Sequence, residues 1–198
     1  MYETFQCLAE HSKSMPSTLR DTIRQSAKSD KALHRLQKFI QSDDVLSSVV
    51  RTTQAIDVIH GGVKSNALPE QTWAIVNHRI AIFSSVAEVE ARDTKLLEGL
   101  AKEFNLTYEA FGSHLSEEGA PSKGTLTLSD YDDASLDPAP ITPTGEGAEP
   151  YRLLSGTIKA TYNAHRSIEG DTSPLIVAPG MMSGNTGMSF RNRNLSQF

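Results

Sequence analysis

The chain has little of several features that would place it in a particular class of protein. A single cysteine among 198 residues rules out an intramolecular disulfide and argues against a thiolate zinc site. The formal net charge of −5 is far from the basic surplus that nucleic-acid-binding proteins usually carry. No apolar run reaches the roughly 18 residues of a membrane span, and the first residues lack the basic-then-apolar pattern of a signal peptide. We therefore expect no nucleic-acid partner and no membrane segment in this chain.

The spacings that hold catalytic metal ions are also missing. None of the six histidines is followed two places later by aspartate, and no pair has the His-Glu-x-x-His spacing. His78 is the most suggestive of the six because it precedes an arginine. The alternation around it places it among Val76, Ile80 and Ile82, which favours a packed histidine over a metal ligand. We expect no metal ion bound by the residues of this chain.

The best-patterned stretch runs from Thr52 to Ile80 and predicts two strands joined by a corner. Thr53–Ile59 is β-branched and apolar around a single acid, and Gly61-Gly62 ends it. Trp73–Phe83 alternates with period two, which places Arg79 on the face opposite its more aliphatic side. A guanidinium held on a strand suits a carboxylate, because its rigid fork of donors matches the two oxygens. A solvated strand arginine is the alternative interpretation of the same spacing.

Helical periodicity lies on both sides of this stretch. Residues 1–50 carry apolar stripes at helical spacing and predict a helical insert. Val86–Phe104 predicts the clearest helix, with Ser85 and Glu88 as a capping box at its start, and Leu106–Phe111 follows as a short strand. The order strand, strand, helix, strand matches the last part of a ferredoxin-like β-α-β-β-α-β unit.

The rest of the chain, residues 113–198, changes composition twice. Residues 113–150 are rich in Ser, Asp, Pro and Gly, which predicts a linker with one short strand at Thr125–Leu128. Order returns after residue 150, where Leu153–Asn163 predicts a helix and Leu175–Ala178 a buried strand. We therefore predict an α+β protein with four parts: a helical insert (1–50), an incomplete ferredoxin-like β-β-α-β domain (51–112), a linker (113–150) and a partial α/β segment (151–198).

The central stretch resembles a known family. TTQAIDVIHGGVKSNALPE, followed by VNHRI and SSVAEVE, is similar to the lid, or dimerisation, domain of the co-catalytic zinc aminoacylase/carboxypeptidase family of metallopeptidases. The similarity is greatest to its fungal vacuolar carboxypeptidases, and it continues in FQCLAEH, DPAPITPT, SGTIKATYN and APGMMSGNT. The opening strand and helix of the lid are not found before Thr52. The resemblance therefore implies an incomplete lid and a fragment of a longer protein.

The resemblance also implies site residues. In this family an asparagine at the lid corner and an arginine on the next strand contact the substrate, and these positions match Asn66 and Arg79. The arginine is expected to grip the free carboxylate of a short peptide. Further along the chain, Gly184, Asn185 and Thr186 match the start of a Gly-Asn-Thr-Asp-Thr motif that helps to hold the substrate. The two residues that follow depart from that motif.

Two functions of different classes follow. The resemblance implies part of a vacuolar zinc metallocarboxypeptidase that uses two zinc ions, removes the C-terminal residue from short peptides and pairs with a second copy through its lid. Hydrolysis with two zinc ions needs a His-x-Asp pair, a bridging aspartate and a glutamate base, which are not found in this chain. We therefore expect the chain alone to be inactive. The alternative is a non-catalytic ferredoxin-like module for dimerisation or interaction.

Overall fold

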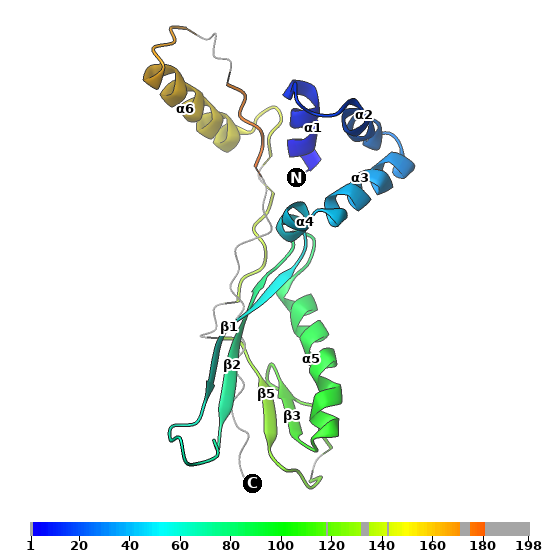
Figure 1. The fold of residues 1–198 in the computed structure, drawn as a ribbon, viewed down its shortest axis with the longest axis vertical. Helices are drawn as coiled ribbons and strands as arrows, with labels where there is room; N and C mark the ends of the chain where they lie inside the picture. The colour runs from blue at the N-terminus through cyan, green and yellow to red at the C-terminus, as the bar shows by residue number, and fades with distance from the viewer. Residues whose placement is uncertain (1, 118, 132–134, 142, 171–174, 181–198) are drawn as a thin grey trace. The chain divides into compact units, whose positions relative to one another are not determined.

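The structure is a computed structural model that describes residues 2–117, 119–131, 135–141, 143–170 and 175–180. These residues form six helices and five strands, and the mixture confirms the α+β class (Figure 1). The chain divides into two compact units. One contains residues 1–50 and the described residues of 140–182, and the other contains the described residues of 51–139.

Four helices make up the first part of the helical unit and confirm the prediction for residues 1–50. Their bounds are α1 (Tyr2–His11), α2 (Ser17–Ser26), α3 (Asp30–Ser42) and α4 (Asp44–Val50). The apolar stripes of the first three helices meet in one core, which consists of Phe5, Ala9, Ile23 and Leu36. Ile23 is fully buried in this core, as the amphipathic spacing of α2 predicts.

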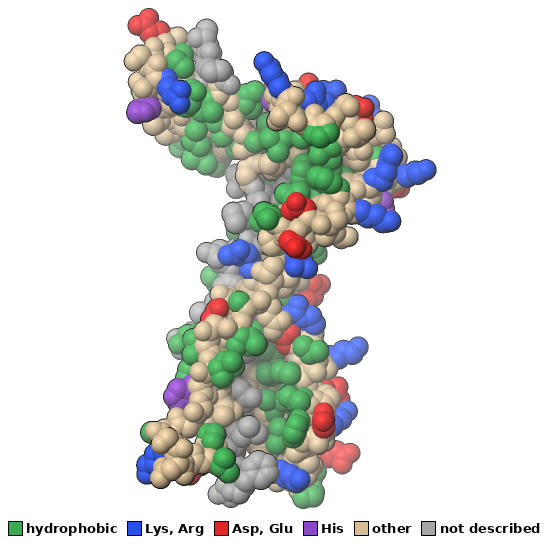
Figure 2. All heavy atoms as spheres, viewed as in Figure 1, with side chains coloured by type: hydrophobic (Ala, Val, Ile, Leu, Met, Phe, Trp, Pro, Cys, Tyr) green, Lys and Arg blue, Asp and Glu red, His purple; other side chains and the backbone are tan. Residues whose placement is uncertain are grey.

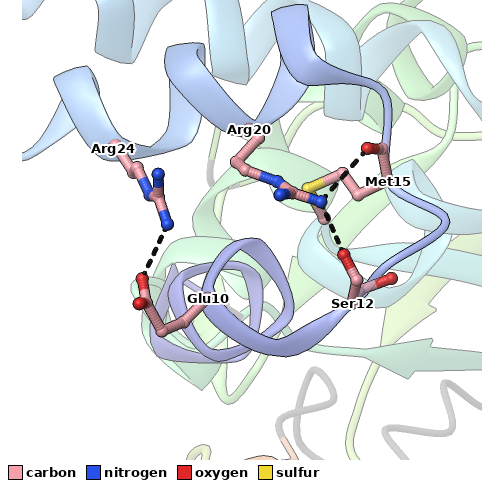
Figure 3. A network of polar contacts seen from close by, with 5 residues as sticks. All are labelled: Glu10, Ser12, Met15, Arg20 and Arg24. Atoms are coloured by element: carbon pink, nitrogen blue, oxygen red, sulfur yellow. Dashed lines mark hydrogen bonds and ion pairs between the residues drawn. The ribbon is translucent and has the colours of Figure 1, made fainter.

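Polar contacts fix the turn between α1 and α2 (Figure 3). Arg20 Nη2 donates to the carbonyl oxygens of Ser12 at 2.6 Å and Met15 at 3.4 Å. These carbonyls lie at the end of α1 and in the turn that follows, where a helix leaves its last acceptors without partners of its own. Arg24 pairs with Glu10 at 3.0 Å, but both side chains are more than half exposed, so this pair contributes little to stability.

Helix α6 (Glu149–His165) confirms and lengthens the helix predicted over Leu153–Asn163. A proline in its first turn suits the start of a helix, because the missing N–H would have had no partner there. None of its residues is buried. Its apolar side chains therefore add little to the core of the helical unit within the described residues.

The prediction of a strand at Leu175–Ala178 is wrong, because residues 175–180 form no strand. A ladder needs a neighbouring strand, and the described part of the helical unit contains none. Side chains satisfy the backbone instead. The Tyr151 hydroxyl donates to the carbonyl of Val177 at 2.6 Å, and the Thr4 hydroxyl donates to the carbonyl of Pro179.

In the second unit, β1 (Thr53–Gly61) and β2 (Thr72–Arg79) form an antiparallel two-stranded sheet, as predicted. The register shifts between Ile56 and Val58, which leaves Asp57 as the extra residue of a bulge. The shift places Ile56 and Ile59 on one face of the hairpin, because their partners lie two residues apart on β2.

Helix α5 (Val86–Glu103) begins where the capping box was predicted. The Ser85 hydroxyl accepts the N–H of Glu88 at 3.2 Å. The Glu88 carboxylate accepts from the Ser84 hydroxyl at 2.8 Å, and the first N–H of the helix donates to Asp137 Oδ1 at 2.8 Å. A carboxylate from 51 residues further along the chain thus caps α5, at the helix end where negative charge is favourable.

Three short strands follow α5 and form a second sheet in the order β4-β3-β5. Here β3 (Thr107–Ala110) pairs antiparallel with β4 (Ser113–His114) and parallel with β5 (Thr125–Leu128). The strand predicted at Thr125–Leu128 is confirmed. The sheet therefore continues past residue 112, into a segment whose composition predicts a linker. Its buried cluster consists of Ala101, Tyr108, Ala110, Leu126 and Leu128.

A second cluster joins the hairpin to α5. Ile80 and Val89 are almost fully buried there, and Val76, Val86 and Phe111 pack against them. The C-terminal half of α5 is different, because Leu96, Leu100 and Phe104 are 68%, 42% and 56% exposed. Hydrophobic side chains are visible along this part of the molecule in Figure 2.

We predict that Ile80→Ala lowers the free energy of unfolding of the second unit by about 2–5 kcal/mol, because it opens a cavity in this cluster. Leu68→Ala is the control, since Leu68 is 87% exposed and its truncation should cost less than about 0.5 kcal/mol. Urea unfolding followed by the fluorescence of Trp73, the only tryptophan of the chain, measures both. Equal losses in the two variants would contradict this packing.

Candidate functional site

Arg79 ends β2 and lies opposite Thr53 in the ladder. Its side chain is exposed, whereas its neighbours His78 and Ile80 are fully buried. The predicted alternation of the strand is therefore confirmed at this position. The guanidinium is accessible to a ligand, and the opposite face of the strand packs in the core.

His78 joins β2 to α5 next to this arginine. Its Nε2 lies 3.2 Å from Oδ2 of Asp93, which is itself 5% exposed. The other oxygen of Asp93 accepts from Arg92, at 3.0 Å from Nε and 2.9 Å from Nη2. A fully buried imidazole, a buried carboxylate and a half-exposed guanidinium thus form one connected cluster. The packed histidine expected from the sequence is confirmed.

The cluster sets the protonation of His78. Burial lowers the pKa of the imidazole below its ordinary value of 6.5, because the charged form loses its hydration. Asp93 opposes this by favouring the imidazolium, while the positive charge of Arg92 lowers the pKa further. A hydrogen bond with the backbone of Val76 also raises it. The net shift is downward, so His78 is neutral at neutral pH.

The contact between His78 and Asp93 also positions Arg79. Because His78 and Arg79 are consecutive, fixing the His78 ring against α5 also fixes the backbone from which the Arg79 side chain leaves. Sequence reasoning missed the partner, Asp93, although a signal was present. Asp93 lies four residues after Val89 and four before Leu97, so it is an acid on the apolar side of α5. An acid in that position needs a buried partner.

Asn66 is exposed in the connection between the strands, at the far end of the hairpin from Arg79. An eight-residue strand spans roughly 23 Å, so one hairpin does not bring these two side chains together. Two glycines shape the connection. A Cβ on Gly61 would lie 2.8 Å from Cγ2 of Thr72, and Gly62 has a φ of +75°. The predicted Gly-Gly corner is explained by both constraints.

A ring stack lies on the same face as Arg79. His60 and Trp73 are partners in the ladder, with ring centroids 5.3 Å apart and planes 16° apart. The other predicted site residues, Gly184, Asn185 and Thr186, lie outside the described residues. Within the part of the chain that the structure describes, no group of three His, Cys, Asp or Glu side chains could hold a metal ion. No described helix is both long and apolar enough to cross a membrane.

Residues 6–105 match the family model of the peptidase dimerisation domain. This range contains β1, β2 and the whole of α5, and with them His78 and Arg79. The chain belongs to the peptidase dimerisation domain family. The resemblance found in the sequence is thereby confirmed, and we call the unit that contains β1, β2 and α5 the lid.

The curated relatives are peptidases and a related hydrolase. The chain is 34% identical over 96% of its length to carboxypeptidase S of Saccharomyces cerevisiae and 32% identical over 93% to a carboxypeptidase of Schizosaccharomyces pombe. It is 26% identical over 76% of its length to the N-fatty-acyl-amino acid synthase/hydrolase of Bos taurus. The alignments cover 32%, 28% and 23% of these proteins, so the chain spans a third or less of their length. No solved structure matches the chain.

The burial of His78 predicts that acid destabilises the lid. The folded-state pKa of His78 is lowered, so below about pH 6.5 the unfolded chain binds more protons and the free energy of unfolding falls, by at most about 1.4 kcal/mol per pH unit from this group. Urea unfolding between pH 5 and 8 measures the slope. We expect His78→Asn to flatten it and the exposed-residue control His34→Asn to leave it unchanged. An identical slope in His78→Asn would contradict the shift.

Proposed function

We propose that this chain supplies the lid of a zinc metallocarboxypeptidase that removes the C-terminal residue from short peptides, and that Arg79 binds the free carboxylate of the substrate. The observation that carries the proposal is the placement of Arg79. It is exposed at the end of β2, on backbone that the buried His78–Asp93 contact holds against α5. An arginine on fixed backbone loses less freedom on binding than one on a mobile loop.

The names of the relatives agree with a carboxylate ligand. A carboxypeptidase and an N-fatty-acyl-amino acid hydrolase both cut an amide bond whose amino-acid side carries a free carboxylate. Arginine suits this group because it donates two parallel hydrogen bonds to the two oxygens. A charge-assisted bond of this kind contributes about 1.5–3 kcal/mol.

Asn66 is the second substrate contact that we propose on the lid. Because it lies at the opposite end of β2, a short peptide held by Arg79 does not reach Asn66 of the same hairpin. In a homodimer formed through the lid, the two ends can serve different copies. Gly184, Asn185 and Thr186 are proposed to hold the substrate backbone, on the strength of their match to the family motif.

Zinc belongs to the proposal for the whole protein, not to the described residues. Two zinc ions would supply Lewis-acid activation of the peptide carbonyl and a metal-bound nucleophile. The described residues do not fit such a centre, since they contain no group of three ligand side chains. We therefore propose that the chain alone is inactive, and that its role is to bind and orient the substrate. By resemblance to the fungal enzymes, we propose a vacuolar location.

The carboxylate role is tested in a chimera in which residues 6–105 replace the matching segment of yeast carboxypeptidase S. We predict that Arg79→Lys lowers kcat/KM for a dipeptide by roughly 10- to 150-fold, because lysine keeps the charge but loses the two-pronged contact. Arg51→Lys, at another exposed arginine, is the control and should not change it. The chain alone serves as the blank, from which we expect no turnover.

Two results would contradict the proposed binding of the substrate carboxylate by Arg79. One is an unchanged kcat/KM in Arg79→Lys. The other is a loss of folding in the same variant, because an exposed arginine that only binds substrate contributes little to stability. Turnover by the chain alone, rising with added zinc, would contradict the proposed inactivity.

The second candidate function is a non-catalytic dimerisation module, and one observation favours it. Within the described residues β1 pairs only with β2, so its other edge presents unpaired backbone groups. Ile56 and Ile59 on the same strand are 62% and 76% exposed. An exposed edge with apolar side chains is suited to pairing with a second chain.

We predict that the chain forms a homodimer and that Ile59→Lys weakens it by about tenfold or more, because one apolar side chain per copy is replaced by a charge. Val45→Lys is the control, since Val45 is equally exposed, at 73%, but lies on α4 outside the lid. Light scattering over a concentration series gives the dissociation constants. Equal weakening by both variants would argue against the β1 edge. A dimer combined with an inactive chimera would favour the module over the peptidase lid.

A further inference from the structure

The turn between α5 and β3 carries a modification motif, Asn105-Leu106-Thr107. Asn-x-Ser/Thr, where x is not proline, is the acceptor sequence for N-linked glycosylation in proteins of the secretory route. We propose that Asn105 carries an N-linked oligosaccharide. The sequence has one other such motif, at Asn194, which lies outside the described residues.

The backbone around Asn105 forms the turn without using its side chain. The φ of Asn105 is +54°, in the left-handed region that asparagine tolerates better than most residues. Its N–H donates to the carbonyl of Lys102 at 3.2 Å, and its carbonyl accepts the N–H of Lys123 at 2.8 Å. Among the described residues its side-chain amide makes no hydrogen bond, and it is exposed. The amide is therefore available to hold a sugar, and the fold does not require it for another contact.

Thr107 is the second requirement of the motif, and the fold does not explain its hydroxyl. Thr107 begins β3, where its N–H donates to the carbonyl of Gly124 at 2.8 Å and its ladder partner is Thr125. Both roles belong to the backbone, so a β-branched side chain without a hydroxyl would serve the strand equally well. The left-handed turn explains why an asparagine is at position 105. The hydroxyl of Thr107 is explained only by the acceptor motif.

The reaction that attaches the sugar balances without any change of oxidation state. The donor is an oligosaccharide linked through a pyrophosphate to a lipid. The Asn105 Nδ2 forms a bond to C1 of the first sugar, and the bond from C1 to the pyrophosphate oxygen breaks. The amide gives up one proton, and the lipid pyrophosphate leaves with the electron pair. The transferase is that of the secretory compartment, so the inference rests on the vacuolar route proposed above and not on peptidase activity.

An oligosaccharide on Asn105 would lie beside exposed apolar side chains of α5. Asn105 directly follows Phe104, and the apolar side chains of Phe104, Leu100 and Leu96 on α5 are all exposed. An oligosaccharide on Asn105 would shield the end of this apolar stripe from other chains. It would also keep a second copy away from this end of α5, leaving the β1 edge free for dimerisation.

The test uses the protein purified from its own cells. Amidase removal of N-linked sugars in water labelled with heavy oxygen converts a glycosylated asparagine to labelled aspartate. Trypsin then releases Glu103–Lys123, which contains Asn105 as its only acceptor and no internal lysine or arginine. We expect this peptide to carry the label at position 105. An unlabelled Glu103–Lys123 peptide would overturn the proposal.

Two substitutions at one position supply the matched controls, expressed in the same cells. Thr107→Val should abolish the label while keeping the β-branched shape of the strand, and Thr107→Ser should retain it. A label that persists in Thr107→Val would overturn the assignment to this motif. The dipeptide assay separates this inference from the proposed function. If the peptide is unlabelled and the chimera with yeast carboxypeptidase S is active, only the glycosylation is refuted. If the peptide is labelled and that chimera is inactive, only the peptidase lid is refuted.

Discussion

The contact between His78 and Asp93 is the constraint on which the candidate site depends. An unpaired carboxylate between a helix and a strand would be costly to bury, so Asp93 requires the imidazole on one side and the Arg92 guanidinium on the other. Such a polar contact has few satisfactory geometries, unlike the apolar contacts around it. It fixes where the end of β2 lies against α5, and with it the origin of the Arg79 side chain.

The two faces of the hairpin in the lid differ in burial. One face packs on α5 through Val76 and Ile80, and the other face presents Arg79 beside an open edge. The bulge at Asp57 adjusts β1 so that its apolar residues share a face with those of β2. Asn66 and Arg79 lie at opposite ends of the hairpin, so one copy of the hairpin does not bring the two side chains together.

Several features of the lid could be predicted from residues that are close together in the sequence. The two strands of the hairpin, the side on which Arg79 lies and the Ser85 cap depend on neighbours within a few residues, and all three are confirmed. The predicted bounds of the second strand are wrong, because β2 ends at Arg79 and not at Phe83. The strand expected at Leu175–Ala178 failed because an apolar run specifies burial but not a partner. There, hydroxyl groups from Thr4 and Tyr151, far away in the sequence, occupy the carbonyls that a ladder would have used.

The sequence by itself determined the α+β class, the family, the helical character of residues 1–50 and the exposed arginine, because periodicity and motif are properties of consecutive residues. Only the tertiary structure decided that Asp93 is the partner of His78, that Asp137 caps α5 from 51 residues away and that β5 joins β3 in parallel. These are contacts between segments whose spacing in the sequence carries no signal. Their formation depends on which buried polar groups and strand edges meet when the chain folds.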